Sequence, residues 1–414
     1  MRVLLAPHGT RGDVQPMIAL AQALHARGHT ATFVAPANFV EWIRAHGFDA
    51  ASNGIDAEAV LTEPGADLHS LRWQVRHLGE LIDRLFDSLA RNAGEEDVIV
   101  GAGIQMAGSS IAELRDVPYA SAVFCPCAVP SRSAPPPPVK TQSLPAWVNR
   151  LLWDVGGPVA TFALRGPINR ARATIGLRPL HDPLEHLAGD RIIVAADRDL
   201  APLGADAPQR AVATDAWFLD AGSADVDDRL AAFLALDPPP VYVGFGSMVA
   251  RHVPQLADQV LAAIRAVGRA AIVAAGWADL GRHFETGDDV LVTRAVPHQL
   301  VLPRVAAAVH HGGAGTTTAV ARAGVPQVVL PHILDQFYWA HRVAQLGLGP
   351  RALPVGLVTA DILADRLHAA IEEPQYGARA AALAQRVGAR NGAPAAVADL
   401  EQLVATWPAA ARTP

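Results

Sequence analysis

The chain has 414 residues, of which 51% are hydrophobic, and it carries a formal net charge of −6. The acidic balance argues against nucleic acid as a partner. Because the sequence contains no run of about 18 apolar residues, we expect no stable membrane insertion. At roughly 100–200 residues per domain, the length predicts two domains.

The amino terminus and the cysteines indicate the compartment. The apolar stretch at residues 2–6 is too short for a signal peptide and fits a first β-strand. Cys125 and Cys127 are one residue apart, so a disulfide between them would be strained, and no further Cys or nearby His completes a zinc pattern. We therefore expect reduced thiols in a cytoplasmic protein.

The first half of the chain alternates strands and helices. Strands are predicted at residues 2–6, 31–35, 97–102, 118–124 and 191–196, and helices at 15–27, 39–45, 69–91, 111–115 and 147–175. The last of these helices is expected to break at Gly156-Gly157-Pro158. The strand–helix–strand opening predicts a parallel sheet with a right-handed crossover.

The second half repeats this alternation after a proline-rich boundary at residues 237–240. Strands are predicted at 241–245, 271–275, 290–293, 305–309 and 327–330, and helices at 254–267, 315–323, 336–346, 359–373 and 380–408. Residues 112–124 and 319–331 share one pattern: a helix end, a turn before proline and a buried strand. Two similarly built halves that face each other would leave a ligand cleft between them.

The most informative stretch is residues 305–336. It is predicted to form a strand, a glycine-rich turn (HHGGAGT, residues 310–316), a helix, a second strand and then the pair Asp335-Gln336. Small residues let backbone N–H groups approach a ligand, Thr316 to Thr318 can cap the helix, and a helix amino terminus binds phosphate. Asp335 and Gln336 follow a strand, at the edge where α/β sheets bind ligands. A phosphate cradle beside a pair suited to hydroxyl groups suggests a phosphorylated sugar.

A second polar loop, residues 7–16, follows the first strand and contains Asp13. A carboxylate at the mouth of the sheet can act as general base on an acceptor hydroxyl, and the alternative is an N-cap for the helix at Gln15. His8 and Arg11 are further polar candidates in this loop. The chain has no GxGxxG fingerprint here, which removes the main support for an NAD enzyme.

His310 and His311 are adjacent at a predicted strand end, so their side chains should point to opposite sides. No third ligand is spaced to complete a metal site. We expect a phosphate hydrogen bond from one of the two and packing for the other. Two weaker candidates are the GFGSM loop at residues 244–248 and residues 294–299, where backbone groups near Val296 can hold a flat base; for both, the alternative is an ordinary connection between strand and helix.

Together these loops resemble the nucleotide-sugar-dependent glycosyltransferases of the two-domain GT-B kind, of the family 1 type. The segments that carry the resemblance are GTRGDVQP, FCPCAVPSRSAPPPP, GFGSM, VPHQLVLPRVAAAVHHGGAGTT and LPHILDQFYWAHRVAQLGLGP. The similarity covers nearly the whole chain. It is greatest to the bacterial antibiotic glycosyltransferases that decorate glycopeptide aglycones, and extends to the related sterol glucosyltransferases.

The resemblance implies an α/β fold of two Rossmann-like β/α/β domains facing each other across a cleft. An acceptor-binding domain would span residues 1–220, a linker 221–240 and a domain binding the nucleotide-sugar donor 241–395. Residues 396–414 would form a C-terminal helix and tail that cross back to the first domain.

The resemblance also assigns roles residue by residue. Asp13 falls on the catalytic base, where plant relatives carry a His, and Val296 falls on the segment that contacts the nucleobase. Asp335 and Gln336 fall on the pair that holds the hydroxyl groups of the donor sugar. The donor-phosphate loops contribute Thr10, Gly246, Ser247, His310, Gly313, Ala314, Gly315 and Thr316. Plant members also carry a Trp that stacks on uracil, and residues 294–299 contain none, so UDP and dTDP both remain open.

The resulting hypothesis is an inverting transfer of glucose or a deoxysugar from a UDP- or dTDP-sugar to a hydroxyl of a lipophilic natural product or peptide. We expect no cofactor and no metal, because the helix dipole and His310 would stabilise the leaving diphosphate, and a monomer or weak homodimer. One alternative is another GT-B enzyme, such as a sterol or lipid glucosyltransferase or an epimerase. Another is a non-catalytic sugar-nucleotide-binding helper, which the presence of Asp13, Asp335 and Gln336 disfavours.

Overall fold

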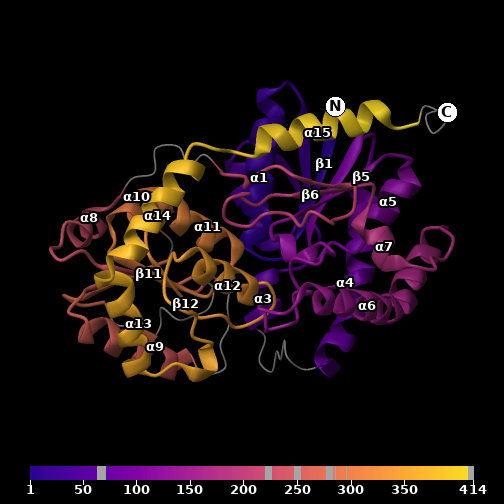
Figure 1. The fold of residues 1–414 in the computed structure, drawn as a ribbon. Coiled ribbons are helices and arrows are strands. Elements are labelled where there is room, and N and C mark those ends of the chain that lie inside the picture. Colours follow the sequence, from indigo (N-terminus) through magenta and orange to yellow (C-terminus); the bar gives the residue numbers. More distant parts are fainter. Residues whose placement is uncertain are drawn as a thin grey trace.

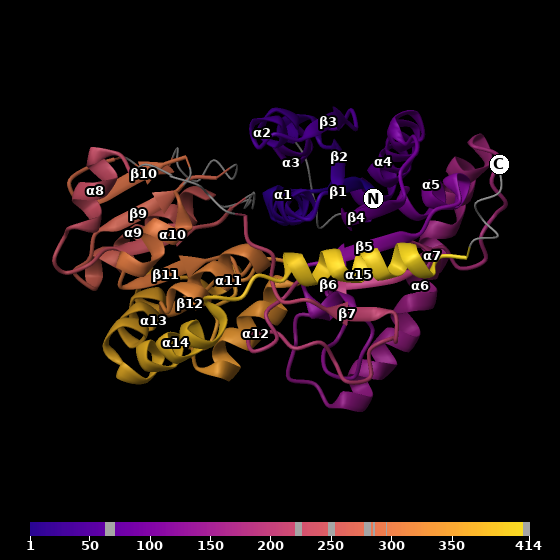
Figure 2. The same ribbon diagram turned by 90° about the horizontal axis from the view of Figure 1, so that it is seen from above.

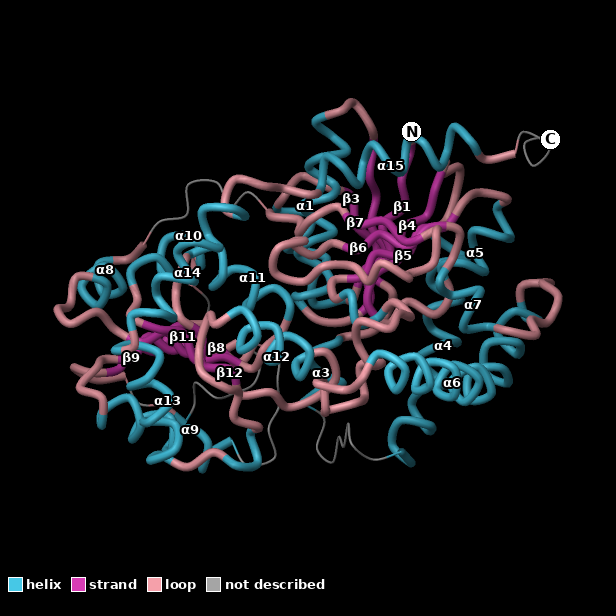
Figure 3. Tube along the Cα trace, in the orientation of Figure 1, coloured by secondary structure: helices cyan, strands magenta, loops and turns pink. Residues whose placement is uncertain are grey.

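The computed structural model describes residues 1–62, 71–219, 226–246, 253–276, 283–284, 286–294 and 296–408, with only the backbone described at 60–62, 71–76 and 253–254. The chain folds into two lobes, each built on a parallel sheet with helices around it (Figures 1 and 3). Among the described residues, no helix is both long enough and apolar enough to cross a membrane.

The N-terminal lobe contains a seven-stranded parallel sheet in the order β3-β2-β1-β4-β5-β6-β7. Its strands are β1 (Arg2–His8), β2 (Thr30–Ala35), β3 (Asp49–Ser52), β4 (Val98–Gly103), β5 (Tyr119–Val123), β6 (Arg191–Val194) and β7 (Ala211–Ala213). The five predicted strands are present. The two additional strands, β3 and β7, are edge strands of four and three residues, which is too short for a pattern that distinguishes them from loops.

The C-terminal lobe contains a five-stranded parallel sheet in the order β10-β9-β8-β11-β12. Its strands are β8 (Val241–Gly244), β9 (Ala271–Ala274), β10 (Val290–Thr293), β11 (Ala307–His310) and β12 (Gln327–Val329). All five were predicted, because each is an apolar run buried by helices on both faces of a parallel sheet.

The helices of the N-terminal lobe are α1 (Arg11–Ala26), α2 (Val40–Ala45), α3 (Ala57–Thr62), α4 (Leu71–Asn92), α5 (Gly108–Arg115), α6 (Ala146–Thr174) and α7 (Pro183–Ala188). Those that follow are α8 (Asp228–Leu234), α9 (Val253–Ala266), α10 (His298–Val301), α11 (Ala314–Ala323), α12 (Gln336–Leu346), α13 (Ala360–Glu372), α14 (Pro374–Val387) and α15 (Ala393–Thr406). Residues 380–408 thus form parts of two helices rather than one, separated at residues 388–392.

Two helices correct the sequence-based boundaries. Helix α1 begins at Arg11, within the predicted loop, because the Thr10 side chain caps it there. Helix α6 runs through Gly156-Gly157-Pro158 without a break. Side-chain hydrogen bonds anchor it on both sides of that point: Trp153 Nε1 donates to the Ala134 carbonyl at 3.0 Å, and Thr161 donates to Asp182 at 2.9 Å.

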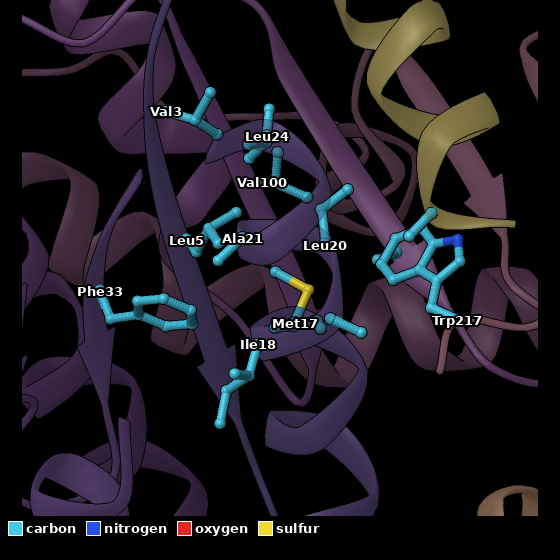
Figure 4. Close-up of a cluster of buried hydrophobic side chains, with 14 of the residues drawn as sticks. Val3, Leu5, Met17, Ile18, Leu20, Ala21, Leu24, Phe33, Val100 and Trp217 are labelled. Atoms are coloured by element: carbon cyan, nitrogen blue, oxygen red, sulfur yellow. The ribbon is translucent and has the colours of Figure 1, made fainter. Parts of the chain in front are cut away.

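The main core of the N-terminal lobe lies between α1 and the strands beside it (Figure 4). Met17, Leu20 and Leu24 of α1 are completely buried, as is Leu5 of β1. Trp217, from the segment after β7, lies against the same cluster. This packing fixes α1, and with it the first turn that carries Asp13.

Helix α15 crosses back from the C-terminal lobe and packs on α1 (Figures 1 and 2). Val397 and Leu400 of α15 are part of the N-terminal core. At the surface, Glu401 accepts hydrogen bonds from Arg27 Nη2 at 2.6 Å and pairs with His29 Nε2 at 2.7 Å. The expected return of the C-terminal helix is therefore confirmed.

An apolar cluster and an ion pair also join the two lobes directly. A third buried cluster combines Cys125, Cys127 and Leu200 of the N-terminal lobe with Trp339 of α12, and both cysteines are free thiols. Next to it, Arg322 of α11 donates two hydrogen bonds to Asp197, at 2.8 and 3.0 Å.

We expect Arg322→Leu to lower the free energy of unfolding by about 3–5 kcal/mol, because it leaves the carboxylate of Asp197 buried without its cation. The Asp197 side chain is completely buried in this pair. Urea unfolding measures the loss. The matched control is Arg91→Leu, which removes an exposed pair with Asp87 and should change stability by no more than about 0.5 kcal/mol. Equal losses in the two variants would contradict the importance of the inter-lobe pair.

Candidate active site

The site residues come from the carboxyl ends of parallel strands in both lobes. In the N-terminal sheet, the strand order reverses beside β1 and β4, and in the C-terminal sheet it reverses beside β8 and β11. Such reversal points leave a crevice in which α/β proteins bind ligands. Asp13 follows β1, and the glycine-rich turn follows β11.

Asp13 lies in the first turn of α1, not in a loop. It forms a capping box with Thr10: the Thr10 hydroxyl caps the helix, and Asp13 Oδ2 accepts a hydrogen bond from the Thr10 backbone N–H at 2.7 Å. Glycines surround the other side of the carboxylate. A Cβ atom at Gly103 would lie 2.9 Å from Asp13 Oδ1, and one at Gly9 would overlap Asp13 Oδ2.

The pKa of Asp13 is raised to about 6. Burial is the main cause, the hydrogen bonds from Thr10 oppose it, and the negative charge of Asp335 raises it further. Asp335 belongs to the C-terminal lobe, so a charge of that lobe acts on Asp13. A carboxylate with this pKa is ionised at neutral pH and is a stronger base than an ordinary Asp.

The amino end of α11 is open. Gly313 is the N-cap residue and no side chain caps the helix, whereas the expectation was that Thr316 to Thr318 would do so. These threonines lie inside the helix, where the Thr317 hydroxyl donates to the Gly313 carbonyl at 2.9 Å. Gly315, in the first turn, is exposed. The result is a cluster of backbone N–H groups at the positive end of a helix dipole, which suits an anion.

The two adjacent histidines have different surroundings, and this corrects the assignment of His310. His310 is completely buried: its Nδ1 accepts from the Gly312 N–H at 3.1 Å, and its Nε2 is 2.9 Å from Gln327 Oε1. Both ring nitrogens are therefore engaged inside the protein. Burial lowers its pKa to about 3, so the ring is neutral.

His311 is less enclosed than His310 and lies beside the glycines of both donor loops. It is half-buried, and its ring lies against Gly246 and Gly313, so that a Cβ atom at Gly313 would overlap Nε2. Its Nδ1 lies 3.4 Å from the Gly244 carbonyl. The sequence predicted packing for one of the two histidines, and the register of β11 gives that role to His310.

Asp335 and Gln336 lie at the start of α12. Asp335 is half-buried, accepts a hydrogen bond from Trp339 Nε1 at 3.2 Å, and has a pKa raised to about 6 by burial. Gln336 is buried, and its Oε1 accepts from the backbone N–H groups of His332 at 2.8 Å and Ile333 at 3.2 Å. Gln336 thus holds the loop before the helix, while the Asp335 carboxylate is held by Trp339.

The other predicted donor residues are placed as follows. Gly246 follows β8 with a positive φ of 57° and contacts His311, whereas Ser247 lies outside the described residues. Val296 follows β10 and its side chain packs into an apolar cluster, so only its backbone is available to a ligand. Ala314 and Thr316 are half-buried in the first turn of α11.

A buried pair between β8 and α10 in the C-terminal lobe had no sequence signal. The Tyr242 hydroxyl lies 2.9 Å from His298 Nε2. Burial lowers the pKa of His298 to about 4, and the positive charge of Arg11 lowers it further. Arg11 belongs to α1 and its guanidinium lies 5.1 Å from the Trp42 ring centroid. Arg11 of the N-terminal lobe therefore contacts Trp42 in its own lobe and acts electrostatically on His298 in the other. His8, in contrast, is buried and bonded to Asn53.

Two further features of the structure concern metal binding and cavities. The described residues contain no cluster of three or more His, Cys, Asp or Glu side chains placed to hold a metal ion. A cavity of about 480 Å³ lies elsewhere, between α5, α7 and Trp407. Tyr119, Asp190 and Arg210 mark its position at the amino ends of β5, β6 and β7, the opposite edge of the sheet from Asp13.

The close packing of Gly103 against Asp13 can be tested separately from the cost of a side chain at a positive φ. Gly103 and Gly28 both have positive φ, at 67° and 76°, but a Cβ atom at Gly28 meets nothing within 4 Å. We expect Gly103→Ala to lower the free energy of unfolding by about 1–3 kcal/mol more than Gly28→Ala, because only the former collides with Asp13 and with the His8 carbonyl. Urea unfolding of both variants measures the difference, and equal losses would contradict the close packing around Asp13.

Two family models match the chain, one in each lobe. Residues 3–129 match the glycosyltransferase family 28 N-terminal domain, and residues 258–403 match the C-terminal domain of proteins like erythromycin biosynthesis protein CIII.

The chain is also similar to individual proteins over nearly its whole length. It is 38% identical to the vancomycin aglycone glucosyltransferase of Amycolatopsis orientalis, over 96% of each chain, and 34% identical to the dTDP-epi-vancosaminyltransferase of the same organism, over 92% of each. The structure of the glycosyltransferase VinC in complex with dTDP shares the fold, with a TM-score of 0.70 and 22% identity over 98% of this chain and 100% of that one. The chain therefore belongs to the GT-B glycosyltransferases of the glycopeptide-antibiotic group.

Proposed function

We propose that the protein is an inverting glycosyltransferase that moves a sugar from a UDP- or dTDP-linked donor to a hydroxyl group of a lipophilic natural product. The observation that carries the proposal is a basic carboxylate in one lobe and an anion site in the other. Asp13 has a raised pKa and follows the carboxyl end of β1, and the uncapped end of α11 provides an anion site in the C-terminal lobe.

The donor diphosphate binds at the amino end of α11 in this proposal. The N–H groups of Ala314, Gly315 and Thr316 and the ring of His311 surround the phosphates, with Gly246 allowing close approach of the backbone. Burial lowers the pKa of His311 to about 4, so in the free protein this ring is neutral at pH 7 and offers a hydrogen bond rather than a charge. Ser247 and Thr10 complete the predicted phosphate contacts.

The donor sugar lies between the phosphates and Asp335. A carboxylate accepts hydrogen bonds from sugar hydroxyl groups, and Asp335 has one oxygen bonded to Trp339 that fixes its direction. Because the side-chain oxygen of Gln336 is bonded to the backbone of its own loop, Gln336 positions Asp335 in this proposal. The nucleobase lies against the backbone at Val296.

The lobe arrangement favours inversion. The leaving diphosphate is held by the C-terminal lobe and the base belongs to the N-terminal lobe, so the acceptor oxygen approaches the anomeric carbon from the side opposite the leaving group. Asp13 takes the proton of that hydroxyl as the new bond forms. The helix dipole of α11 and His311 stabilise the charge that develops on the diphosphate.

The relatives indicate the range of substrates. One is named for glucosyl transfer to a glycopeptide aglycone and another for a dTDP-linked aminosugar, and the VinC structure contains dTDP. We extend to this chain a hydroxyl acceptor on a natural product and a donor linked to UDP or dTDP. Calorimetric titration with UDP and with dTDP distinguishes the two nucleotides, and no binding of either would refute the proposal.

The base assignment predicts a pH profile. Asp13 acts only when ionised, so kcat/KM should rise with pH, approach a plateau above about pH 6 and fall about tenfold per pH unit below it. Asp13→Asn should lower kcat about 10²–10⁴-fold with little change in donor KM. Asp154→Asn, at an exposed carboxylate of α6, is the control and should leave both constants unchanged. Transfer by Asp13→Asn at the wild-type rate would show that another group is the base.

The anion site at α11 predicts opposite effects of one substitution on binding and on stability. A side chain at Gly315 meets nothing within 4 Å, so Gly315→Asp fits without strain. The new carboxylate should stabilise the helix end by about 0.3–1 kcal/mol. The same charge should raise the Kd of UDP and dTDP at least tenfold by repelling the diphosphate. Gly315→Asn adds the same volume without the charge, and equal nucleotide affinities for the two variants would place the phosphates elsewhere.

A further inference from the structure

The outer face of α6 carries an apolar stripe that nothing in the described structure covers. The stripe consists of five large side chains with the following exposed fractions: Trp147 70%, Leu151 51%, Val155 58%, Val159 65% and Phe162 83%. Figure 1 shows α6 along the lower edge of the N-terminal lobe. Soluble monomers rarely leave a continuous apolar surface of this kind, which usually marks an interaction site.

The spacing makes the five side chains one surface. Positions 147, 151, 155 and 159 are four residues apart, so they form one ridge of the helix, and Phe162 falls within the same sector of about 120°. Residues 155–164 contain no charged side chain. On the amino side, Arg150 and Asp154 pair with each other at 3.0 Å, and on the carboxyl side Arg165 follows Phe162 by three residues.

The stripe cannot turn inward, because the opposite face of α6 is already used. Arg172 is buried and paired with Glu113 at 2.8 Å. Asn149 and Asn169 donate to the carbonyls of Arg132 and Leu180, each at 3.0 Å. These bonds hold the helix at both ends with the stripe outward.

The stripe is complementary to a second copy of itself. If two α6 helices pack antiparallel about a two-fold axis at Val155, Leu151 of one copy faces Val159 of the other. Trp147 then lies beside Phe162 of the other copy. Such i, i+4 ridges pack at a crossing angle of roughly −50°, so the helices are closest at the axis and diverge toward the ends. The side chains match this shape, since Val155 and Gly156 are small and the aromatic residues are at the ends.

We propose that α6 is the interface of a symmetric homodimer centred on Val155. If an exposed aromatic side chain presents roughly 150–250 Å², the five residues offer on the order of 600 Å² per copy, and the pair approaches the roughly 1,200 Å² of the smaller specific interfaces. A lipid surface fits less well, because membrane-surface helices have a cationic polar face. Here Arg150 is neutralised by Asp154, and although α6 also carries Arg165 and Arg170, the net charge of −6 on the whole chain opposes attraction to anionic lipid.

Sedimentation equilibrium tests the dimer directly. The wild-type chain should sediment at twice its mass of 43.5 kDa at micromolar concentration. Val155→Arg places two like charges at the axis and should raise the dimer Kd at least 100-fold. Leu357→Arg, at an exposed apolar residue of the C-terminal lobe, is the matched control and should leave the dimer intact. A wild-type monomer at 100 µM, or a dimer that Val155→Arg leaves unchanged, would overturn the proposal.

Cysteine crosslinking tests the antiparallel register. Val155→Cys should form a disulfide-linked dimer on mild oxidation, because each copy meets its own residue at the axis. Leu151→Cys and Val159→Cys should each crosslink poorly alone but efficiently when mixed, because residue 151 of one copy faces residue 159 of the other. The native Cys125 and Cys127 are buried, so they provide a low background. Efficient crosslinking of Leu151→Cys alone would indicate another register and overturn the one proposed.

Vesicle flotation distinguishes a lipid surface from a second copy. Vesicles of phosphatidylcholine with phosphatidylglycerol should not retain the wild-type protein. Retention that Val155→Arg abolishes, in a protein that sediments as a monomer, would overturn the dimer in favour of membrane docking. Nucleotide binding by Val155→Arg, measured in the same preparation, confirms that the variant is folded.

Discussion

The open amino end of α11 is the feature on which the rest of the site depends. A helix terminus leaves backbone N–H groups without partners, and proteins usually satisfy them with a side-chain cap. Here the cap position is Gly313, whose Cβ would overlap the ring of His311. The preceding Gly312 has a φ of 87° and is packed against Val329 and Gln336. Bare backbone is therefore required at both positions, and the N–H groups remain available to an anion.

The same helix fixes the relation between the lobes. Arg322, near the carboxyl end of α11, binds the buried carboxylate of Asp197 in the N-terminal lobe. A ten-residue helix is about 15 Å long, so the anion site lies one short rigid element away from an inter-lobe anchor. Any movement of the C-terminal lobe relative to Asp13 would therefore have to move this anchor. The charge of Asp335, which belongs to the C-terminal lobe, contributes to the raised pKa of Asp13 in this arrangement.

Much of this arrangement could be predicted from the sequence, because buried parallel strands are apolar runs and the loops that follow them share one edge of a sheet. That rule alone placed Asp13, the glycine-rich turn and Asp335 on the cleft. Two features could not be predicted from the sequence: the register of β11, and which residue begins α11. His310 and His311 have the same local pattern, and only the pairing of β11 with β12 directs His310 to Gln327 in the interior. Similarly, three threonines near a helix start suggest a cap, but the helix begins before them.

The continuous helix α6 shows how far tertiary contacts can override local preference. Glycine costs about 1 kcal/mol and proline about 3 kcal/mol in a helix interior, and α6 contains three glycines and two prolines. On local preference alone, the prediction of a break at Gly156-Gly157-Pro158 was reasonable. The bonds from Trp153 and Thr161 on either side of that point stabilise the helical path. Those bonds explain why the helix continues from Trp147 to Phe162, but they do not require the side chains along it to be apolar. Polar residues at these exposed positions would satisfy the same fold at lower risk of aggregation, so the apolar character of the stripe calls for a partner surface rather than a folding role.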